Sequence, residues 1–134
     1  MSSLPRGVET VLLVEDEDEV RRVVKTGLGF TGYRVIEARN GPEALEAARS
    51  HDGEVHLLIT DVVMPGMSGR ELAERLVAEK AGIRILFMSG YTDDVISGHG
   101  IDSSRVAFLQ KPFSGADLAR KVREVLDRRP PVTR

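Results

Sequence analysis

The sequence predicts an α/β fold in which five parallel strands form one open, doubly wound sheet with helices on both faces. Three observations support this prediction. The chain has 134 residues, the length of a single domain. Short apolar runs alternate with stretches of helical periodicity, and most of these runs are nearly continuous, as in parallel strands that are buried on both faces. Because 41% of the residues are hydrophobic but only 4% are aromatic, we expect an aliphatic core.

Five apolar runs are predicted to form the strands. The runs at residues 10–14, 56–60, 84–88 and 106–109 are almost uninterrupted, so we expect them to occupy central positions in the sheet. Residues 33–38 alternate polar with apolar side chains, which predicts a half-exposed strand at a sheet edge.

The segments between the strands are predicted to be helical. Apolar residues recur every three or four positions in residues 20–28 and 118–126, which is typical of amphipathic helices. Gly41 and Pro42 open an Ala-rich helix that extends to about Arg49, because proline is accepted in a first helical turn.

Two further helices are expected. Ser68 can cap a helix whose apolar positions follow from residue 72. The fourth helix, near residues 92–97, is expected to be short and mobile, because Gly98 and Gly100 follow it and few apolar positions hold it down.

The chain is predicted to contain one folded unit. We expect a flexible N-terminal segment or linker at residues 1–7, a single domain at residues 8–128 and a flexible tail at residues 129–134, where Pro130 and Pro131 stop the last helix. No output domain is expected within this chain.

Composition excludes several kinds of function. The net charge of -2 lacks the basic excess that binding to many phosphates needs, so we expect no direct contact with nucleic acid. The absence of cysteine excludes disulfides, thiolate zinc sites and thiol nucleophiles. No apolar stretch approaches the ~20 residues of a membrane span, so we expect a soluble, cytoplasmic protein that does not contact a membrane directly.

Polar residues follow four of the predicted strands. Glu15 and Asp16 follow the first strand, Asp61 the third, Ser89 the fourth and Lys111 the fifth. Ligands of such sheets bind at the carboxyl ends of the strands, so we expect these side chains to converge. Three gathered carboxylates repel one another unless a cation neutralises them, and oxygen ligands suit Mg²⁺ better than zinc. A hydroxyl and a lysine beside the metal suit an anionic phosphoryl group, so the set predicts phosphoryl transfer.

These residues lie in four motifs, namely VEDE at 14–17, DVVMPGMSG at 61–69, MSG at 88–90 and KPF at 111–113. With these motifs in this order, the chain resembles the receiver domains of two-component response regulators over roughly residues 8–127. The resemblance implies the flavodoxin-like (βα)5 receiver fold with strand order 2-1-3-4-5. The run as a whole looks most like the C-terminal receiver of a hybrid sensor histidine kinase.

The resemblance also implies a role for each site residue. Asp61 would be the phosphoacceptor, which takes the phosphoryl group of a phosphohistidine on a histidine kinase or a histidine phosphotransfer domain. Asp16 and Asp61 would bind Mg²⁺ or Mn²⁺, with the backbone carbonyl of Val63 as a further ligand. Glu15 would contact the ion either directly or through a water. Lys111 would pair with the carboxylate at rest and with the phosphoryl oxygens afterwards.

The resemblance further implies a switch. The Ser89 hydroxyl would move toward the phosphoryl group while Phe108 swings inward, which alters the surface of the fourth and fifth helices. The peptide bond between Lys111 and Pro112 would be cis. Val63 and Tyr91 would tune hydrolysis of the aspartyl phosphate, for which we predict a lifetime of minutes or longer. A phosphorylation-dependent dimer is also expected.

Each of these residues has an ordinary explanation when taken alone. The acidic run at 15–19 favours the first turn of a helix, Asp61 and Ser89 suit turns or caps, and a lysine before proline is usually solvated. None of these explanations accounts for the residues falling together past four strands of one sheet, so we reject them jointly.

Other functions remain as alternatives. A stand-alone single-domain response regulator is the nearest, since it differs only in whether the native protein continues upstream. A scaffold that binds partners without phosphorylation would not need the intact acidic and lysine set. A Mg²⁺-dependent phosphatase of the dehalogenase type carries an acid/base aspartate where this chain has Val63. As an isolated chain, we expect the protein to be a phosphoacceptor that assists its own phosphorylation and dephosphorylation, and not a turnover enzyme.

Overall fold

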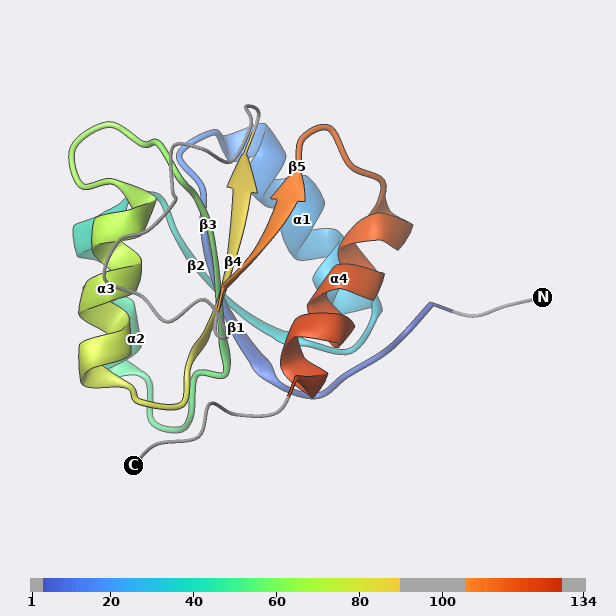
Figure 1. Ribbon diagram of the computed structural model, residues 1–134, viewed down its shortest axis with the longest axis horizontal. Coiled ribbons are helices and arrows are strands. Elements are labelled where there is room, and N and C mark those ends of the chain that lie inside the picture. The colour runs from blue at the N-terminus through green and yellow to red at the C-terminus, as the bar shows by residue number, and fades with distance from the viewer. Residues whose placement is uncertain (1–3, 90–105, 129–134) are drawn as a thin grey trace.

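The computed structural model describes residues 4–89 and 106–128, which form one five-stranded sheet with helices on both faces (Figure 1). All strand pairs are parallel, and the strand order is β2-β1-β3-β4-β5. This arrangement confirms the doubly wound fold and the strand order that the sequence predicts. The strands are β1 (Thr10–Val14), β2 (Arg34–Ala38), β3 (Leu57–Asp61), β4 (Arg84–Ser89) and β5 (Val106–Gln110), and the helices are α1 (Asp18–Phe30), α2 (Gly41–Ser50), α3 (Gly69–Glu79) and α4 (Gly115–Asp127).

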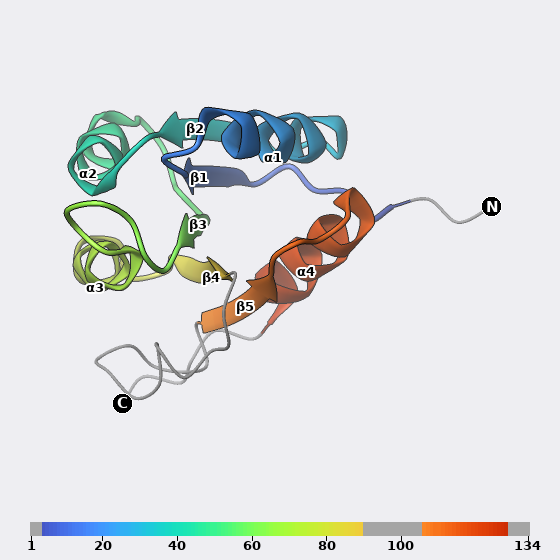
Figure 2. The same ribbon diagram turned by 90° about the horizontal axis from the view of Figure 1, so that it is seen from above.

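The core lies in two layers, one on each face of the sheet. Leu12 and Val14 of β1 face one cluster, which α2 and α3 cover, whereas Val11 and Leu13 face the other, which α1 and α4 cover. Figure 2 shows these two pairs of helices on opposite sides of the strands. Every residue of β1 and of β3 is buried, because both strands have a neighbour on each side and helices on both faces.

The strand predictions are confirmed to within one residue at each end, with one error of position. β2 lies at a sheet edge, as its alternating sequence predicts. The prediction that residues 106–109 are central is wrong, because β5 pairs only with β4 within the part of the chain that the structure describes. Its buried and exposed residues alternate, and Phe108 is 38% exposed. A short apolar run does not distinguish a strand with two neighbours from an edge strand with one.

Local signals define the starts of three helices. Asn40, Ser68 and Ser114 each accept a hydrogen bond from the backbone N–H three residues later, and Ser114 forms a full capping box with Asp117. The cap at Ser68 and the proline-containing first turn of α2 are therefore confirmed. The helix predicted near residues 92–97 lies outside the described residues, as do residues 129–134.

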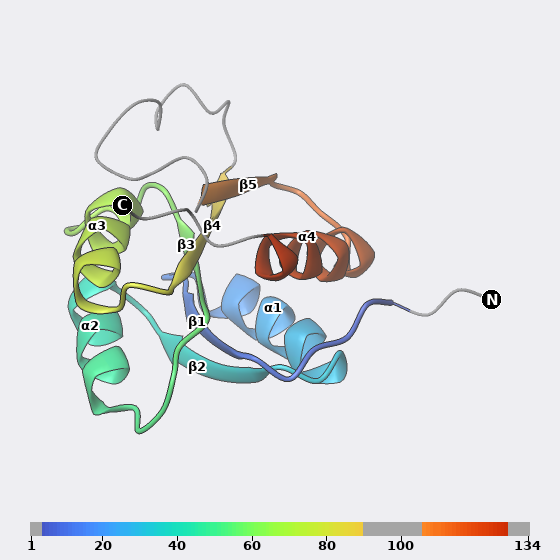
Figure 3. The ribbon, with the colours of Figure 1, turned by 60° about the horizontal axis from the view of Figure 1, so that its bottom comes forward.

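The segment before β1 contacts the end of α1 and a side chain of α4. The Gly7 amide donates to the Thr31 carbonyl at 3.0 Å, and an Arg6 guanidinium nitrogen lies 3.3 Å from the Phe30 carbonyl. Arg123 of α4 binds both carboxylate oxygens of Glu9, at 3.1 and 2.7 Å. Figure 3 shows this segment passing the end of α1 on its way to β1. The domain boundaries at residues 7 and 128 remain predictions.

No helix among residues 4–89 and 106–128 combines the length and the apolar character that crossing a membrane requires.

Candidate functional site

Three carboxylates meet at the carboxyl edge of the sheet. Glu15 and Asp16 directly follow β1, and Asp61 is the last residue of the neighbouring strand β3. One oxygen from each residue lies within 4.8 Å of the others. Glu15 is fully buried and Asp61 is nearly so, whereas Asp16 is exposed. The structure thus brings together the three acidic residues that the sequence singled out.

Lys111 reaches the same site from the loop between β5 and α4. Its Nζ lies 2.7 Å from Asp61 Oδ1 and 3.1 Å from Glu15 Oε1, so one ammonium group bridges two carboxylates. The backbone N–H of Lys111 donates to the Ser89 carbonyl at 2.7 Å, which ties the loop to the end of β4. The peptide bond between Lys111 and Pro112 is cis, as the resemblance implies.

The burial of these groups alters their ionisation. Burial raises the pKa of Glu15, and a hydrogen bond to Asp61 raises it further. Burial acts to lower the pKa of Lys111, but hydrogen bonds and charge interactions with Asp61 and Glu15 outweigh it, so the pKa is raised. Lys111 therefore remains positively charged at neutral pH and neutralises part of the negative charge of the pocket.

The donor set fits a hard divalent cation. Three carboxylates with only one lysine bridging two of them leave an excess of negative charge at a partly buried position. Mg²⁺ and Mn²⁺ prefer such oxygen ligands, and Mg²⁺ commonly uses few carboxylates and keeps several waters. Val63, whose carbonyl is a predicted ligand, lies in the loop that directly follows Asp61, and its side chain is 69% exposed.

The backbone around Asp61 is closely packed. The Gly69 N–H donates to the Val62 carbonyl at 2.8 Å, and the Val62 N–H donates to the Met88 carbonyl at 3.3 Å. A Cβ atom added to Gly69 would overlap the carbonyl oxygen of Asp61. The start of α3 can approach β3 this closely only because residue 69 has no side chain.

Three further residues that the sequence predicted for the site are Ser89, Phe108 and Tyr91. Ser89 is the last residue of β4 and is partly exposed, at the same sheet edge as Asp61. The ring of Phe108 stacks on Phe87 with a centroid distance of 5.7 Å. Their roles in a switch remain predictions. Tyr91 lies outside the described residues.

Two residues at this edge were missed as functional candidates. Gly69 has the packing role described above, and Arg21 of α1 donates to the backbone carbonyl of Glu15 at 2.8 Å. A signal for Arg21 exists, because it follows Asp18 by three residues, a spacing that allows an ion pair on a helix. No sequence pattern indicates that Arg21 contacts a backbone carbonyl.

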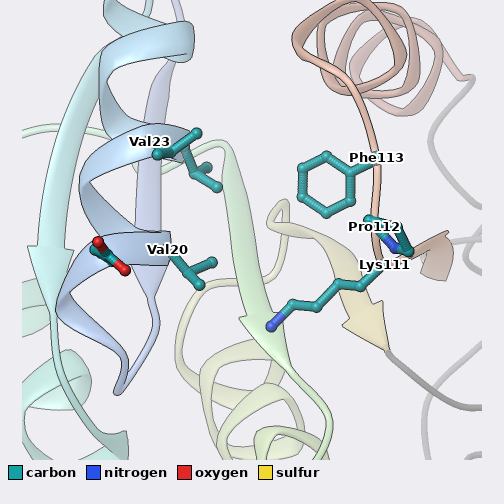
Figure 4. A pocket seen from close by; sticks show the side chains of 7 residues that line it. Val20, Val23, Lys111, Pro112 and Phe113 are labelled. Carbon is teal, nitrogen blue, oxygen red and sulfur yellow. The ribbon is translucent and has the colours of Figure 1, made fainter.

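An apolar pocket lies beside Lys111. It has a volume of about 510 Å³ and separates α1 from the loop before α4. Figure 4 shows Val20 and Val23 facing Phe113 across this pocket, with Lys111 and Pro112 at its border. Val23 is 71% exposed, so α1 presents an apolar side chain to solvent beside this pocket. We call this surface the α1 pocket; its lining residues are Glu19, Val20, Val23, Val24, Lys111, Pro112 and Phe113.

Comparison with known proteins identifies close relatives. Residues 11–123 match the family described as the response regulator receiver domain. The chain is 43% identical over 122 residues to the sensor kinase CckA of Brucella abortus (strain 2308), which covers 91% of this chain but only 13% of that protein. It is 32% identical over 119 residues to the response regulator receiver protein CpdR of the same organism, which covers 89% of this chain and 98% of that protein.

Solved structures agree with these matches. The receiver domain from the hybrid histidine kinase CckA is 37% identical, with a TM-score of 0.73 over 88% of this chain and 99% of that chain. The response regulator TrrA from Thermotoga maritima, solved in complex with Mg(2+)-BeF, is 31% identical, with a TM-score of 0.74 over 87% of this chain and 98% of that chain.

Proposed function

Because the chain belongs to the response regulator receiver domain family of two-component signalling, we propose that Asp61 accepts a phosphoryl group from a phosphohistidine with the help of a divalent cation. The observation that carries this proposal is the bridge from Lys111 to both Asp61 and Glu15, at 2.7 and 3.1 Å, beside the exposed Asp16. This arrangement supplies a nucleophile, a fixed positive charge and a cation site at one edge of the sheet.

In the proposed reaction, an Asp61 carboxylate oxygen attacks the phosphorus atom. The new bond joins this oxygen to phosphorus, the bond from phosphorus to the histidine nitrogen breaks, and its electron pair stays on the imidazole. Lys111 leaves its ion pair with the Asp61 carboxylate and binds a phosphoryl oxygen instead. Magnesium, when bound, would neutralise charge on the phosphoryl oxygens. The protein mainly positions these groups, because the transition state of phosphoryl transfer is loose.

The acidic residues would have distinct tasks. Asp16 is exposed and can bind the cation directly, and Asp61 can do so through its second oxygen. One Glu15 oxygen accepts from the Glu17 amide at 3.0 Å and the other from Lys111 at 3.1 Å. Because both oxygens already have partners, we favour the arrangement in which Glu15 accepts a hydrogen bond from a water molecule that is bound to the cation.

We propose that the α1 pocket receives the phosphohistidine donor. Lys111 belongs both to the pocket and to the Asp61 site, so a partner seated there lies beside the phosphoacceptor. The exposed Val23 and the ring of Phe113 offer apolar surface, and Glu19 offers a charge at the border. A helix of a histidine kinase or a histidine phosphotransfer domain fits this chemistry.

The context of the domain is a separate proposal. We favour the receiver of a hybrid histidine kinase, since the identity to CckA is 43% against 32% for the stand-alone CpdR. The chain spans 13% of that kinase, so any kinase activity would belong to a longer protein. We propose no direct contact with nucleic acid, because the net charge is -2.

Intact mass spectrometry tests the central proposal. The chain is incubated with acetyl phosphate, with and without Mg²⁺, beside an Asp61→Asn variant. We expect a gain of one phosphoryl group, ~80 Da, that requires Mg²⁺ and is absent in the variant. A gain that persists in Asp61→Asn would place the phosphoacceptor elsewhere. No gain together with no binding of Mg²⁺ would favour the scaffold instead.

A further inference from the structure

Arg21 joins three separate elements at the base of the acidic site. Its Nη1 donates to the backbone carbonyl of Glu15 at 2.8 Å. Its Nη2 binds Asp18 in the first turn of α1 at 2.6 Å, and its Nε lies 3.4 Å from the carboxylate of Glu37 on β2. The Arg21 side chain is only 14% exposed, and its contact with the Glu15 carbonyl is partly buried, whereas its partners Asp18 and Glu37 are 71% and 35% exposed.

The carbonyl that Arg21 binds belongs to the peptide unit between Glu15 and Asp16. The N–H of Glu15 donates to the Ala38 carbonyl at the end of β2, at 3.2 Å. The strand pairing thus fixes one side of Glu15, and Arg21 fixes the other. A rotation of this peptide unit would move the Asp16 carboxylate, which is the exposed ligand of the proposed cation site.

The contacts require a guanidinium group. Three of its nitrogens are used, toward acceptors on the loop, on α1 and on β2. The planar fork of arginine presents donors in several fixed directions, whereas the ammonium group of lysine is a point charge on a flexible stem. A lysine at position 21 would keep the charge but lose the simultaneous contacts.

We propose that Arg21 is a positioning residue for the divalent cation: its fork orients the peptide between Glu15 and Asp16 and thereby sets the affinity of the site. This inference rests on the cation site of the proposed function. If Arg21 acted only through its charge, removing it would change the affinity for the cation in the opposite direction. A positive charge near the site repels a cation, so its loss alone would strengthen binding.

The test compares Arg21→Met, which removes charge and fork, with Arg21→Lys, which keeps the charge. Binding of MgCl₂ to the unphosphorylated chain is followed by amide NMR shifts at constant ionic strength. Because outer groups that orient metal ligands typically change affinity by 10–100-fold, we expect the Kd for Mg²⁺ to rise about tenfold in both variants. The same spectra report whether each variant is folded.

Arg49→Met is the matched control. Arg49 also forms a fork, with both carboxylate oxygens of Glu79 at 3.0 and 2.5 Å, but it joins α2 to α3 on the other face of the sheet. We expect its Kd for Mg²⁺ to equal that of the unmodified chain. Arg21→Lys is the milder change and keeps the test decisive if Arg21→Met does not fold.

Each outcome decides the inference. Weaker binding in both Arg21 variants with unchanged binding in the control supports it. Unchanged or tighter binding in the Arg21 variants overturns it, as does full affinity in Arg21→Lys, which would show that the guanidinium fork is not required. Absence of Mg²⁺ binding in the unmodified chain would instead overturn the cation site, and with it the proposed function on which this inference rests.

Discussion

Among the described residues, the ion pair of Glu9 and Arg123 shows the largest pKa shifts. Arg123 contacts both carboxylate oxygens of Glu9 and also Asp127, and each partner of the Glu9 pair is only 22% exposed. The hydrogen bond to Arg123 lowers the pKa of Glu9 to about 2, against the action of burial, which raises it. The Glu9 backbone carbonyl also accepts from the Arg34 N–H at 3.0 Å. Glu9, which directly precedes β1, is therefore bound to α4 through its side chain and to β2 through its backbone.

A change of Glu9 to Gln tests this pair through its pH dependence. Because the pKa is lower in the folded chain, the ionised carboxylate stabilises folding fully above its ordinary pKa of 4.5 and loses this effect as the pH falls toward 2. We expect Glu9→Gln to reduce the free energy of unfolding by at most about 3 kcal/mol at pH 7. The difference from the unmodified chain should shrink as the pH approaches 3. Urea unfolding at several pH values measures it, and a difference that does not depend on pH would contradict the assignment.

Val63 offers a prediction about the lifetime of the phosphorylated state. Val63 follows Asp61 by two residues and is 69% exposed, so the loop after the proposed phosphoacceptor presents an apolar side chain to solvent. We expect Val63→Asn to shorten the lifetime several-fold, because an amide can hold a water near the phosphoryl group. Decay of the phosphorylated mass after removal of acetyl phosphate measures the rate. Equal decay in both proteins would show that position 63 does not tune hydrolysis.

At the scale of elements, most of the fold is predictable from local patterns. The strand ends agree within one residue, because β1, β3 and β4 are covered on both faces and therefore have nearly continuous apolar sequences. The caps at Ser68 and the start of α2 are also local signals. The position of β5 was not predictable from its residues, because the number of neighbouring strands depends on contacts between distant segments.

The junction of β3 and α3 gives a prediction at this scale. We expect Gly69→Ala to lower the free energy of unfolding by about 2 to 3 kcal/mol, because the added methyl group overlaps the Asp61 carbonyl and forces α3 away from β3. The rate of phosphorylation by acetyl phosphate should fall as well, since Asp61 itself must shift. Thermal unfolding and intact mass spectrometry measure the two effects.

Gly115→Ala is the matched control for this substitution. Gly115 is the first residue of α4, as Gly69 is of α3, but an added Cβ meets no atom within 4 Å. Since alanine favours a helix over glycine by up to ~1 kcal/mol, we expect this variant to be as stable as the unmodified chain or slightly more so. Equal stability of both variants would mean that α3 adjusts freely.

At the scale of the whole molecule, the site depends on pairs of residues that are far apart in the sequence. Lys111 and Glu15 are separated by 96 positions and meet at 3.1 Å. The motifs predicted this meeting, since each follows a strand and parallel strands end at one edge of the sheet. In the sequence, Gly69 is only the last residue of the motif at 61–69 and Arg21 is marked only by its spacing from Asp18, so neither residue's contact at the site could be predicted. Their partners are backbone carbonyls, which every residue carries and no pattern marks.

The gathering of three carboxylates at one edge also links cation binding to the stability of the whole fold. Like charges that are brought together by folding destabilise the folded state, and a cation that binds only the folded state stabilises it. We expect Mg²⁺ to raise the midpoint of thermal unfolding, and Asp16→Asn to remove most of this gain while leaving stability without Mg²⁺ equal or higher. Asp52→Asn, at an exposed position before β3, should respond to Mg²⁺ as the unmodified chain does. A full gain in Asp16→Asn would mean that the stabilising cation binds away from the acidic site.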